Sequence, residues 1–256
     1  MQQFMAATIR IMPFLLPTLL LSACAHDSAD LAANDPAAPT NRAIFGGNMF
    51  IDRHATKPIA RLYTSDVPKG ARRGVHHFIA NLEEPKIFIN DVLQGNFSRS
   101  WNTVQRFTIN TTVGGLGLFD VAQGWGLPSH KADFGQTFGV WGIGTGPDVQ
   151  LPLLGFTNLR DVAGKGIGMV ANPFSLVSGP VVAVISGTDK GLSVVDERAD
   201  QLPLTDSVEK NSLDHYATFR SMMDQHRAAF IQDGREGRVH PAKADVAVAD
   251  NSLNQS

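Results

Sequence analysis

Apolar and polar positions follow a helical spacing over much of the chain. Near the C-terminal end, Tyr216, Phe219, Met223 and Phe230 recur at steps of three, four and seven residues, which places their side chains on one face of a helix. No comparable stretch alternates apolar and polar residues at every second position, as a half-buried strand does. The pattern therefore predicts an all-α fold built from several helices.

Three further helices are predicted between residues 66 and 108. Asp66-Val67-Pro68 has the residue types of a helix start, with an acidic cap and a proline in the first turn. Glu83-Glu84-Pro85 repeats that pattern, and its carboxylates would face the positive end of a second helix that closes at Gly95. Apolar residues at helical spacing over 101–108 predict the third.

The middle of the chain is rich in glycine and poor in charge. Of the 24 glycines, 14 lie between Gly114 and Gly168. Each glycine within a helix costs roughly 1 kcal/mol relative to alanine, so another interaction must offset that cost. Two explanations are open: close backbone packing in a compact core, or short helices joined by flexible turns that lie against lipid.

The first residues have the pattern of an export signal. Arg10 is the only charged residue before an apolar run over 11–21, which is shorter than the ~20 apolar residues that span a bilayer. Leu21-Ser22-Ala23-Cys24 then resembles the bacterial lipobox, whose cysteine is acylated and becomes the first mature residue. Cys24 is the only cysteine, which excludes an internal disulfide. We expect a stable acyl anchor at Cys24, and Ala25 after it favours the outer membrane over inner-membrane retention.

Composition divides the chain into four parts. Residues 1–23 are predicted to be a lipoprotein signal peptide. Residues 24–40, rich in Ala, Asp, Asn and Pro, are predicted to be a flexible linker after the lipidated cysteine. Residues 41–233 then form one helical domain, and 234–256 a disordered C-terminal tail.

Composition and motifs also argue against several function classes. A net charge of −2 without a Lys/Arg-rich run does not favour nucleic acid as a partner. The chain lacks a Gly-x-Ser-x-Gly nucleophile motif, and Glu83 and Glu84 are neighbours that would not face each other on a helix. The histidines are scattered without metal-ligand spacing, so neither a metal nor a cofactor is expected: His76, His77, His130, His215 and His226. A non-enzymatic role is favoured, with an exported phospholipase and a purely structural envelope lipoprotein as alternatives.

Several short stretches occur in the order typical of one lipoprotein family. They are Asn81-Leu82-Glu83-Glu84-Pro85, Leu93-Gln94-Gly95, Arg106-Phe107, the glycine-rich runs 114–122 and 134–147, and Asp196-Glu197-Arg198-Ala199. Together they cover roughly residues 35–230. In these stretches the chain resembles the MlaA (VacJ) family of outer-membrane phospholipid-transport lipoproteins, in agreement with the lipobox.

This resemblance implies a fold and a function. It implies a multi-helix, donut-like ring that lies in the plane of the inner leaflet of the outer membrane, with Gly-rich connecting turns. A polar channel through the ring would let headgroups pass, because burying an unpaired charge in hydrocarbon costs several kcal/mol. It further implies that mislocalised phospholipid moves between the outer membrane and a soluble periplasmic carrier of the MlaC type, beside a porin trimer, which maintains lipid asymmetry.

Two groups of residues are candidates for contact with lipid. The glycines Gly139, Gly142, Gly144 and Gly146 are predicted to form a flexible segment of the channel wall. Asn48, Asp52 and Arg53 are predicted to present polar atoms near it. Arg160-Asp161 is expected to be a structural ion pair or helix cap.

Overall fold

The computed structural model describes residues 33–171 and 180–239. Its elements, in chain order, are α2 (Ala38–Ile51), the π-helix η1 (Asp52–Thr56), α3 (Lys57–Asp66), α4 (Lys69–Leu93), α5 (Phe97–Thr112), α6 (Val121–Gly124), α7 (Phe134–Val140), β1 (Asp148–Leu151), β2 (Gly155–Asn158), α8 (Leu159–Val170), α9 (Pro180–Asn211) and α10 (His215–Glu236). The predicted signal peptide and Cys24 lie outside the described residues. The chain is mostly helical, as predicted.

The chain is helical from Ala38 to Asp66, where the sequence pattern predicted no helix. α2, η1 and α3 follow one another with helical backbone at each junction, and α3 ends at Val67, which is extended (φ −90°, ψ 122°). Pro68 explains this end, because proline disfavours helical backbone in the residue before it. Asp66 therefore closes one helix instead of capping the next, which begins at Lys69.

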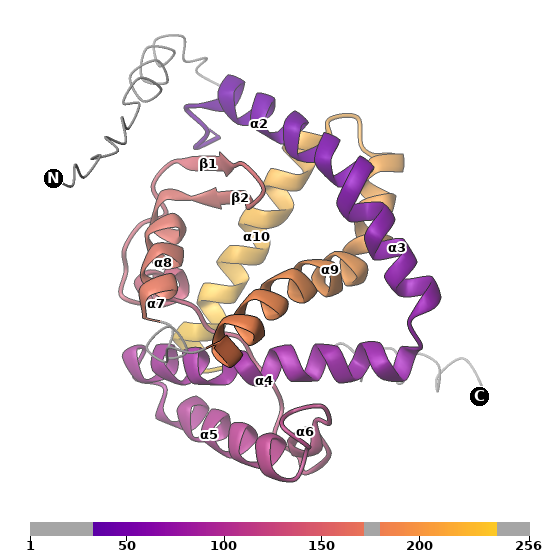
Figure 1. The fold of residues 1–256 in the computed structure, drawn as a ribbon. Helices are drawn as coiled ribbons and strands as arrows, with labels where there is room; N and C mark the ends of the chain where they lie inside the picture. Colours follow the sequence, from indigo (N-terminus) through magenta and orange to yellow (C-terminus); the bar gives the residue numbers. More distant parts are fainter. Residues whose placement is uncertain (1–32, 172–179, 240–256) are drawn as a thin grey trace, which may run out of the picture.

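The predicted helix boundary at Glu83-Glu84-Pro85 is wrong. α4 runs unbroken from Lys69 to Leu93 with Pro85 inside it. Pro85 lacks a backbone N–H and so removes one helical hydrogen bond, but α4 packs along α5 over much of its length (Figure 1). The tertiary contacts of α4 thus outweigh the local helix-breaking signal. The predicted helices over 101–108 and 216–230 are confirmed as parts of α5 and α10.

A small antiparallel hairpin corrects the all-α prediction. β1 pairs with β2 from Asp148 opposite Asn158 to Leu151 opposite Gly155. Leu153 and Gly155, with φ of 64° and 75°, make the turn. Each strand has four residues, too few to show a period-two pattern against a glycine-rich background.

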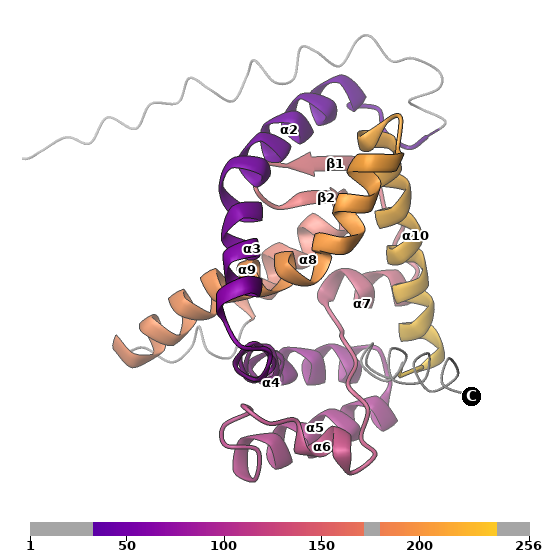
Figure 2. The same ribbon diagram turned by 90° about the vertical axis from the view of Figure 1, so that its right-hand side faces the viewer.

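The elements are arranged as an outline with two helices passing through it. In Figure 1, α2 and α3, α4, the α7–α8 pair and the hairpin follow the outline, while α9 and α10 cross its interior and α5 and α6 lie beyond α4. Figure 2, turned by 90°, shows α10 along one side, α2 and α3 along the other, and α5 and α6 at the base. α9 packs on α3 and α4, and α10 packs on α7.

The folded region extends slightly beyond the predicted 41–233. Asp35 is completely buried, and α2 already begins at Ala38, within the stretch predicted to be a linker. At the other end α10 continues to Glu236 and closes on Gly237, which has the left-handed conformation (φ 65°) typical of a helix C-terminus.

Candidate functional site: a polar interior with an apolar exterior

The distribution of polarity differs from that of a water-soluble domain. Among the described residues, nineteen buried side chains are polar or charged and ten are hydrophobic, and five of those ten are alanines. Soluble proteins bury large apolar side chains and almost never bury charges that are not paired. The interior of this chain therefore supplies little apolar packing volume and depends on hydrogen bonds and ion pairs.

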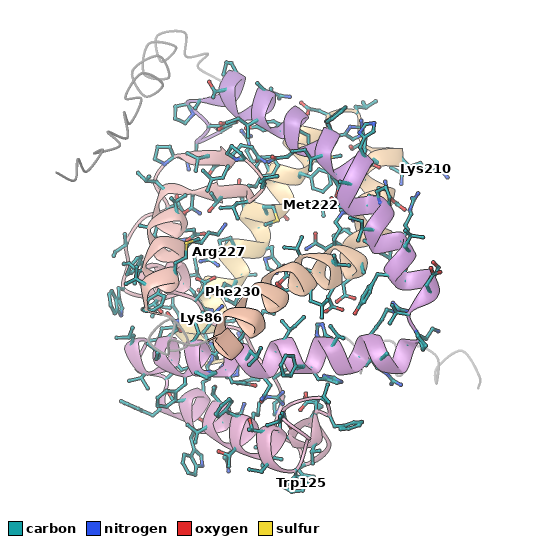
Figure 3. The ribbon with its side chains drawn as sticks, in the orientation of Figure 1. Lys86, Trp125, Lys210, Met222, Arg227 and Phe230 are labelled. Carbon is teal, nitrogen blue, oxygen red and sulfur yellow. The ribbon has the colours of Figure 1, made fainter. Side chains whose placement is uncertain are left out.

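The outside carries the large apolar side chains. All three tryptophans, Trp101, Trp125 and Trp141, are exposed, by 64%, 62% and 54%; Trp125 lies at the outer edge of the α5–α6 region in Figure 3. The same holds for many other residues of the outlining elements, among them Phe50, Ile59, Leu62, Phe88, Phe97, Leu116, Phe119, Ile143, Leu153, Leu154, Leu159, Met169 and Val170. Apolar area on this scale marks an interaction surface for protein or lipid. Yet within the described residues no helix is long and apolar enough to cross a membrane.

A buried ionic network joins α4 to α5. The Arg106 guanidinium, 2% exposed, donates to Glu84 Oε1 at 3.0 Å, to Asp120 Oδ2 at 2.9 Å and to the Leu127 carbonyl at 2.6 Å. Burial raises the pKa of the Glu84 carboxyl to about 7, although Arg106 opposes the shift. One cation thus serves two carboxylates in a dry environment.

A second buried group follows along the same two helices. Asp91 of α4, which is inaccessible to solvent, accepts from Thr103 of α5 at 3.0 Å and contacts His130 Nε2 at 2.8 Å. Arg99 Nε lies 3.3 Å from the same carboxylate, and its terminal nitrogens donate to backbone carbonyls. These contacts hold the loop after α6 against the α4–α5 pair.

A third group ties α10 to α7 and α8. Arg227 of α10 donates to both oxygens of Asp133, at 2.7 and 2.8 Å, and its Nε lies 2.7 Å from Asp161 Oδ2. Asp133 caps α7 through the Gln136 N–H, and Arg160 Nε also contacts Asp161, at 2.9 Å. Burial opposes the shift, yet Arg227 holds the pKa of Asp133 below its ordinary value. The expected structural role of Arg160-Asp161 agrees with these contacts.

Beside this group lies a hollow with a volume of about 600 Å³. Its walls come from α4, the start of α7, the hairpin, α8 and α10. Arg227 and Phe230 of α10 and Lys86 of α4 lie inside the outline of the molecule in Figure 3. Two further hollows, of about 430 and 540 Å³, adjoin it, because each shares lining residues with it: Leu154 and Phe156 with the first, Asp148 and Asp224 with the second.

The four predicted glycines lie in three different local environments. A Cβ on Gly139 would lie 2.9 Å from Ile231 of α10, so this position serves close helix packing. Gly142 and Gly146 have φ of 86° and 66°, which favour glycine in tight turns, whereas Gly144 faces open space. Gly139, Gly142 and Gly144 all border the 540 Å³ hollow.

The three predicted polar residues contact protein instead of standing free. Asn48 clamps the hairpin turn: its amide donates to the Leu151 carbonyl at 2.9 Å and its oxygen accepts from the Leu153 N–H at 2.9 Å. Asp52 pairs with Arg198 of α9 through contacts of 2.7 and 2.8 Å, and Arg53 reaches Glu209 at 3.3 Å. Asn48 and Asp52 line the 430 Å³ hollow at the turn end of the hairpin, whereas the hollow bordered by the glycines lies at its open end.

One cluster has no counterpart in the sequence spacing. His76 Nδ1 of α4 lies 2.8 Å from Asp196 of α9, and together with Asp200 these residues bring three possible metal-ligand atoms within 4.8 Å of one another. Tyr63 of α3 also donates to Asp196, at 3.1 Å. The cluster links three helices whose residues are far apart in the sequence, so no local motif could reveal it.

Comparison with known proteins decides the family. The model of the MlaA lipoprotein family matches residues 33–230. The chain belongs to the MlaA lipoprotein family. It is 34% identical to the "intermembrane phospholipid transport system lipoprotein MlaA" of Escherichia coli K12, over 89% of this chain and 90% of that protein. It is also 34% identical to an uncharacterized protein of Rickettsia felis, over 81% and 82% of the two chains.

A solved structure agrees with this assignment. This structure, described as "Structural basis for maintenance of bacterial outer membrane lipid asymmetry", superposes on the present chain with a TM-score of 0.68 at 30% sequence identity. The match covers 77% of this chain and 98% of that one.

The MlaA-like stretches of the sequence meet in the buried core. A Cβ on Gly117, in the first glycine-rich run, would lie 2.5 Å from the Asn81 side chain, so only glycine fits there without a shift. Glu84, Arg106 and Asp120, from three different stretches, form the α4–α5 network. The motifs that carry the family resemblance therefore specify packing as well as any transport role.

Proposed function

We propose that this MlaA-family protein is the lipid-anchored outer-membrane component of a phospholipid transport system. In this role it moves mislocalised phospholipid between the outer membrane and a periplasmic carrier and so maintains lipid asymmetry. The names of the relatives and the lipobox support this function. The observation that carries it is the exchanged polarity, with charges buried inside and large apolar side chains outside.

The helices are proposed to lie in the plane of the membrane as a ring. The exposed apolar residues would then face the hydrocarbon of the inner leaflet, where their exposure no longer costs free energy. The hollows that adjoin one another between the hairpin, α8 and α10 would form the polar path for headgroups. A charged headgroup needs such a path because an unpaired charge in hydrocarbon costs several kcal/mol.

The predicted site residues take more limited roles in this proposal. Gly142 and Gly144 border a hollow and are proposed to form the flexible part of the channel wall. Asn48 and Asp52 line the hollow at the turn end of the hairpin and would present polar atoms there. Arg53 lies outside the lining residues of these hollows and is proposed only to hold α9 through Glu209.

The anchor and the partners follow from the lipobox and the family. We infer that Cys24 is acylated and holds the domain on the periplasmic side of the outer membrane through the linker. A porin trimer beside the ring and a soluble MlaC-like carrier below it are the proposed protein partners. Neither a cofactor nor nucleic acid enters this function.

An exported phospholipase is the alternative from a different class. The MlaA family consists of transport lipoproteins and not of enzymes. Two of the buried carboxylates are paired with basic side chains: Glu84 with Arg106, and Asp91 with Arg99 and His130. Purified protein should therefore release no fatty acid from phospholipid vesicles.

The first test measures outer-leaflet phospholipid in the native host. Deletion of the gene should raise the phospholipid content of the outer leaflet, and the wild-type gene should restore it. A Cys24→Ala variant should fail to restore the wild-type outer leaflet. The same variant fused to an unrelated transmembrane anchor distinguishes a need for membrane attachment from a need for acylation. An unchanged outer leaflet in the deletion strain would contradict the proposed function.

A further inference from the structure

The charges around the 600 Å³ hollow are only partly paired with one another. Arg227 is held by Asp133 and Asp161, as described above. Lys86 is held by Glu83, with its Nζ 2.8 Å from the carboxylate. These pairs are satisfied within the protein and leave little attraction for a ligand.

Two carboxylates on this hollow have no cation partner among the described residues. Asp148, at the start of β1, is 5% exposed, and its Oδ2 makes no hydrogen bond. Its Oδ1 receives only the Asn34 amide, at 3.4 Å. Asp224 of α10 lines the same hollow, and the nearby Arg220 is directed instead to Asp35, at 2.9 Å.

The charge of Asp224 also acts on Asp148. Burial, followed by the charge of Asp224, raises the pKa of the Asp148 carboxyl to about 6. Burial likewise raises the pKa of Asp224. Asp148 is buried whereas Asp224 is exposed on the same hollow, and neighbouring carboxylates without a cation partner favour a bound cation. A metal ion is a poor candidate, because within the described residues these carboxylates join no group of three possible ligands.

A basic group without an ion-pair partner among the described residues lines the same hollow. Lys165 of α8 is exposed and makes no ion pair with the described residues, and desolvation by the surrounding protein lowers the pKa of its ammonium group. His226 of α10 lies beside Phe230 and offers a further nitrogen. Around these polar groups, Leu154, Met169 and Met223 give the hollow an exposed apolar margin.

We propose that this hollow recognises a zwitterionic phospholipid headgroup, with its phosphate at Lys165 and its ammonium at Asp224 in front of the buried Asp148. The site would then favour ethanolamine-type phospholipids over anionic glycerol-type phospholipids, whose headgroup supplies no cation for the two carboxylates. The apolar margin would hold the start of the acyl chains. This inference rests on the proposed function and adds a substrate preference to it.

The test is titration calorimetry of the full mature protein in detergent. The probes are phosphatidylethanolamine and phosphatidylglycerol with six-carbon acyl chains, used below their micelle concentrations. The ethanolamine lipid should bind about five-fold more tightly, which corresponds to one partly exposed ion pair. Asp224→Asn should remove that preference, whereas Lys165→Met should weaken the binding of both lipids, because both carry a phosphate.

Matched controls separate the site from general charge effects. Asp66→Asn and Lys69→Met change the same residue types at exposed positions away from the hollow and should leave both affinities unchanged. Asp148→Asn should also reduce the preference, and its circular dichroism spectrum verifies that it folds. Equal binding of the two lipids by the wild type would overturn the inference and leave the proposed function standing. Binding of neither lipid would overturn both the inference and the assignment of this hollow as the headgroup path.

Discussion

Glu84 shows how strongly the interior controls individual residues. Its sequence context, two acids before a proline, is that of a helix start, yet its side chain is 4% exposed and lies against Arg106 in the middle of a helix. Arg106 is shared with Asp120, whose pKa it holds below the ordinary value although burial opposes this. The buried trio therefore carries one more negative than positive charge when Glu84 is ionised.

This excess charge predicts a pH-dependent stability. The pKa of Glu84 rises from 4.5 in the unfolded chain to about 7 in the folded one, so folding disfavours its ionised form. The stability that the protonated form provides is full below about pH 4.5 and is lost as the pH rises through 7. Glu84→Gln should abolish this loss, which is of order 1–3 kcal/mol.

Urea unfolding in detergent at pH 5 and at pH 8 measures how much the free energy of unfolding changes between the two pH values. The neighbouring Glu83→Gln variant serves as the control, because Glu83 pairs with Lys86 and its side chain is 36% exposed. This variant should show the same change in the free energy of unfolding as the wild type. If the free energy of unfolding changed equally between pH 5 and pH 8 in the wild type and in Glu84→Gln, the assigned role of Glu84 would be contradicted.

At the scale of elements, the glycines decide how closely the helices approach. A Cβ on Gly164 of α8 would lie 2.4 Å from the backbone nitrogen of Gly135 in α7, and one on Gly135 would meet Arg227 and Asp161. The α7–α8 pair therefore packs backbone against backbone around the Arg227 ion pairs. Of the two explanations for the glycine-rich region, close packing accounts for these positions and tight turns for Gly142 and Gly146.

Two alanine substitutions distinguish packing from flexibility in the predicted channel segment. Gly139→Ala should destabilise the protein by about 1–3 kcal/mol, because its Cβ would overlap Ile231. Gly144→Ala faces open space and should change stability by less than about 1 kcal/mol. Thermal unfolding checks both values, and adding Ile231→Ala to Gly139→Ala should recover part of the loss. A larger loss for Gly144→Ala than for Gly139→Ala would refute the packing assignment.

At the scale of the whole molecule, the buried charges and exposed apolar side chains make the stability of the fold depend on its surroundings. The surface exposes large apolar side chains that water would disfavour, while paired charges are buried between the elements. A hydrocarbon surrounding removes the cost of the first and makes the pairing of the second more important, because lone charges there are costly.

The tryptophans report on this environment directly. All three are exposed: Trp101 and Trp125 lie in the α5–α6 region, and Trp141 directly follows α7. Three variants each keep one tryptophan and replace the other two with phenylalanine. In nanodiscs made with brominated phospholipid, the fluorescence of each single-tryptophan variant should be strongly quenched. Nanodiscs of the same lipid without bromine are the control. Fluorescence insensitive to bromine would show that the apolar exterior contacts something other than lipid.

The sequence by itself determined the mostly helical class and, through several short stretches, the family, while the lipobox at Cys24 stays a prediction. These features depend on neighbours in the chain, such as the helical spacing of Tyr216 to Phe230, and so they can be predicted locally. Only the tertiary structure decided that Glu84 lies mid-helix, that Gly139 packs on Ile231, and that Asp148, Lys165 and Asp224 share one hollow. The physical reason is distance along the chain: Arg227 meets Asp133 across 94 residues, and such contacts leave no mark in local spacing.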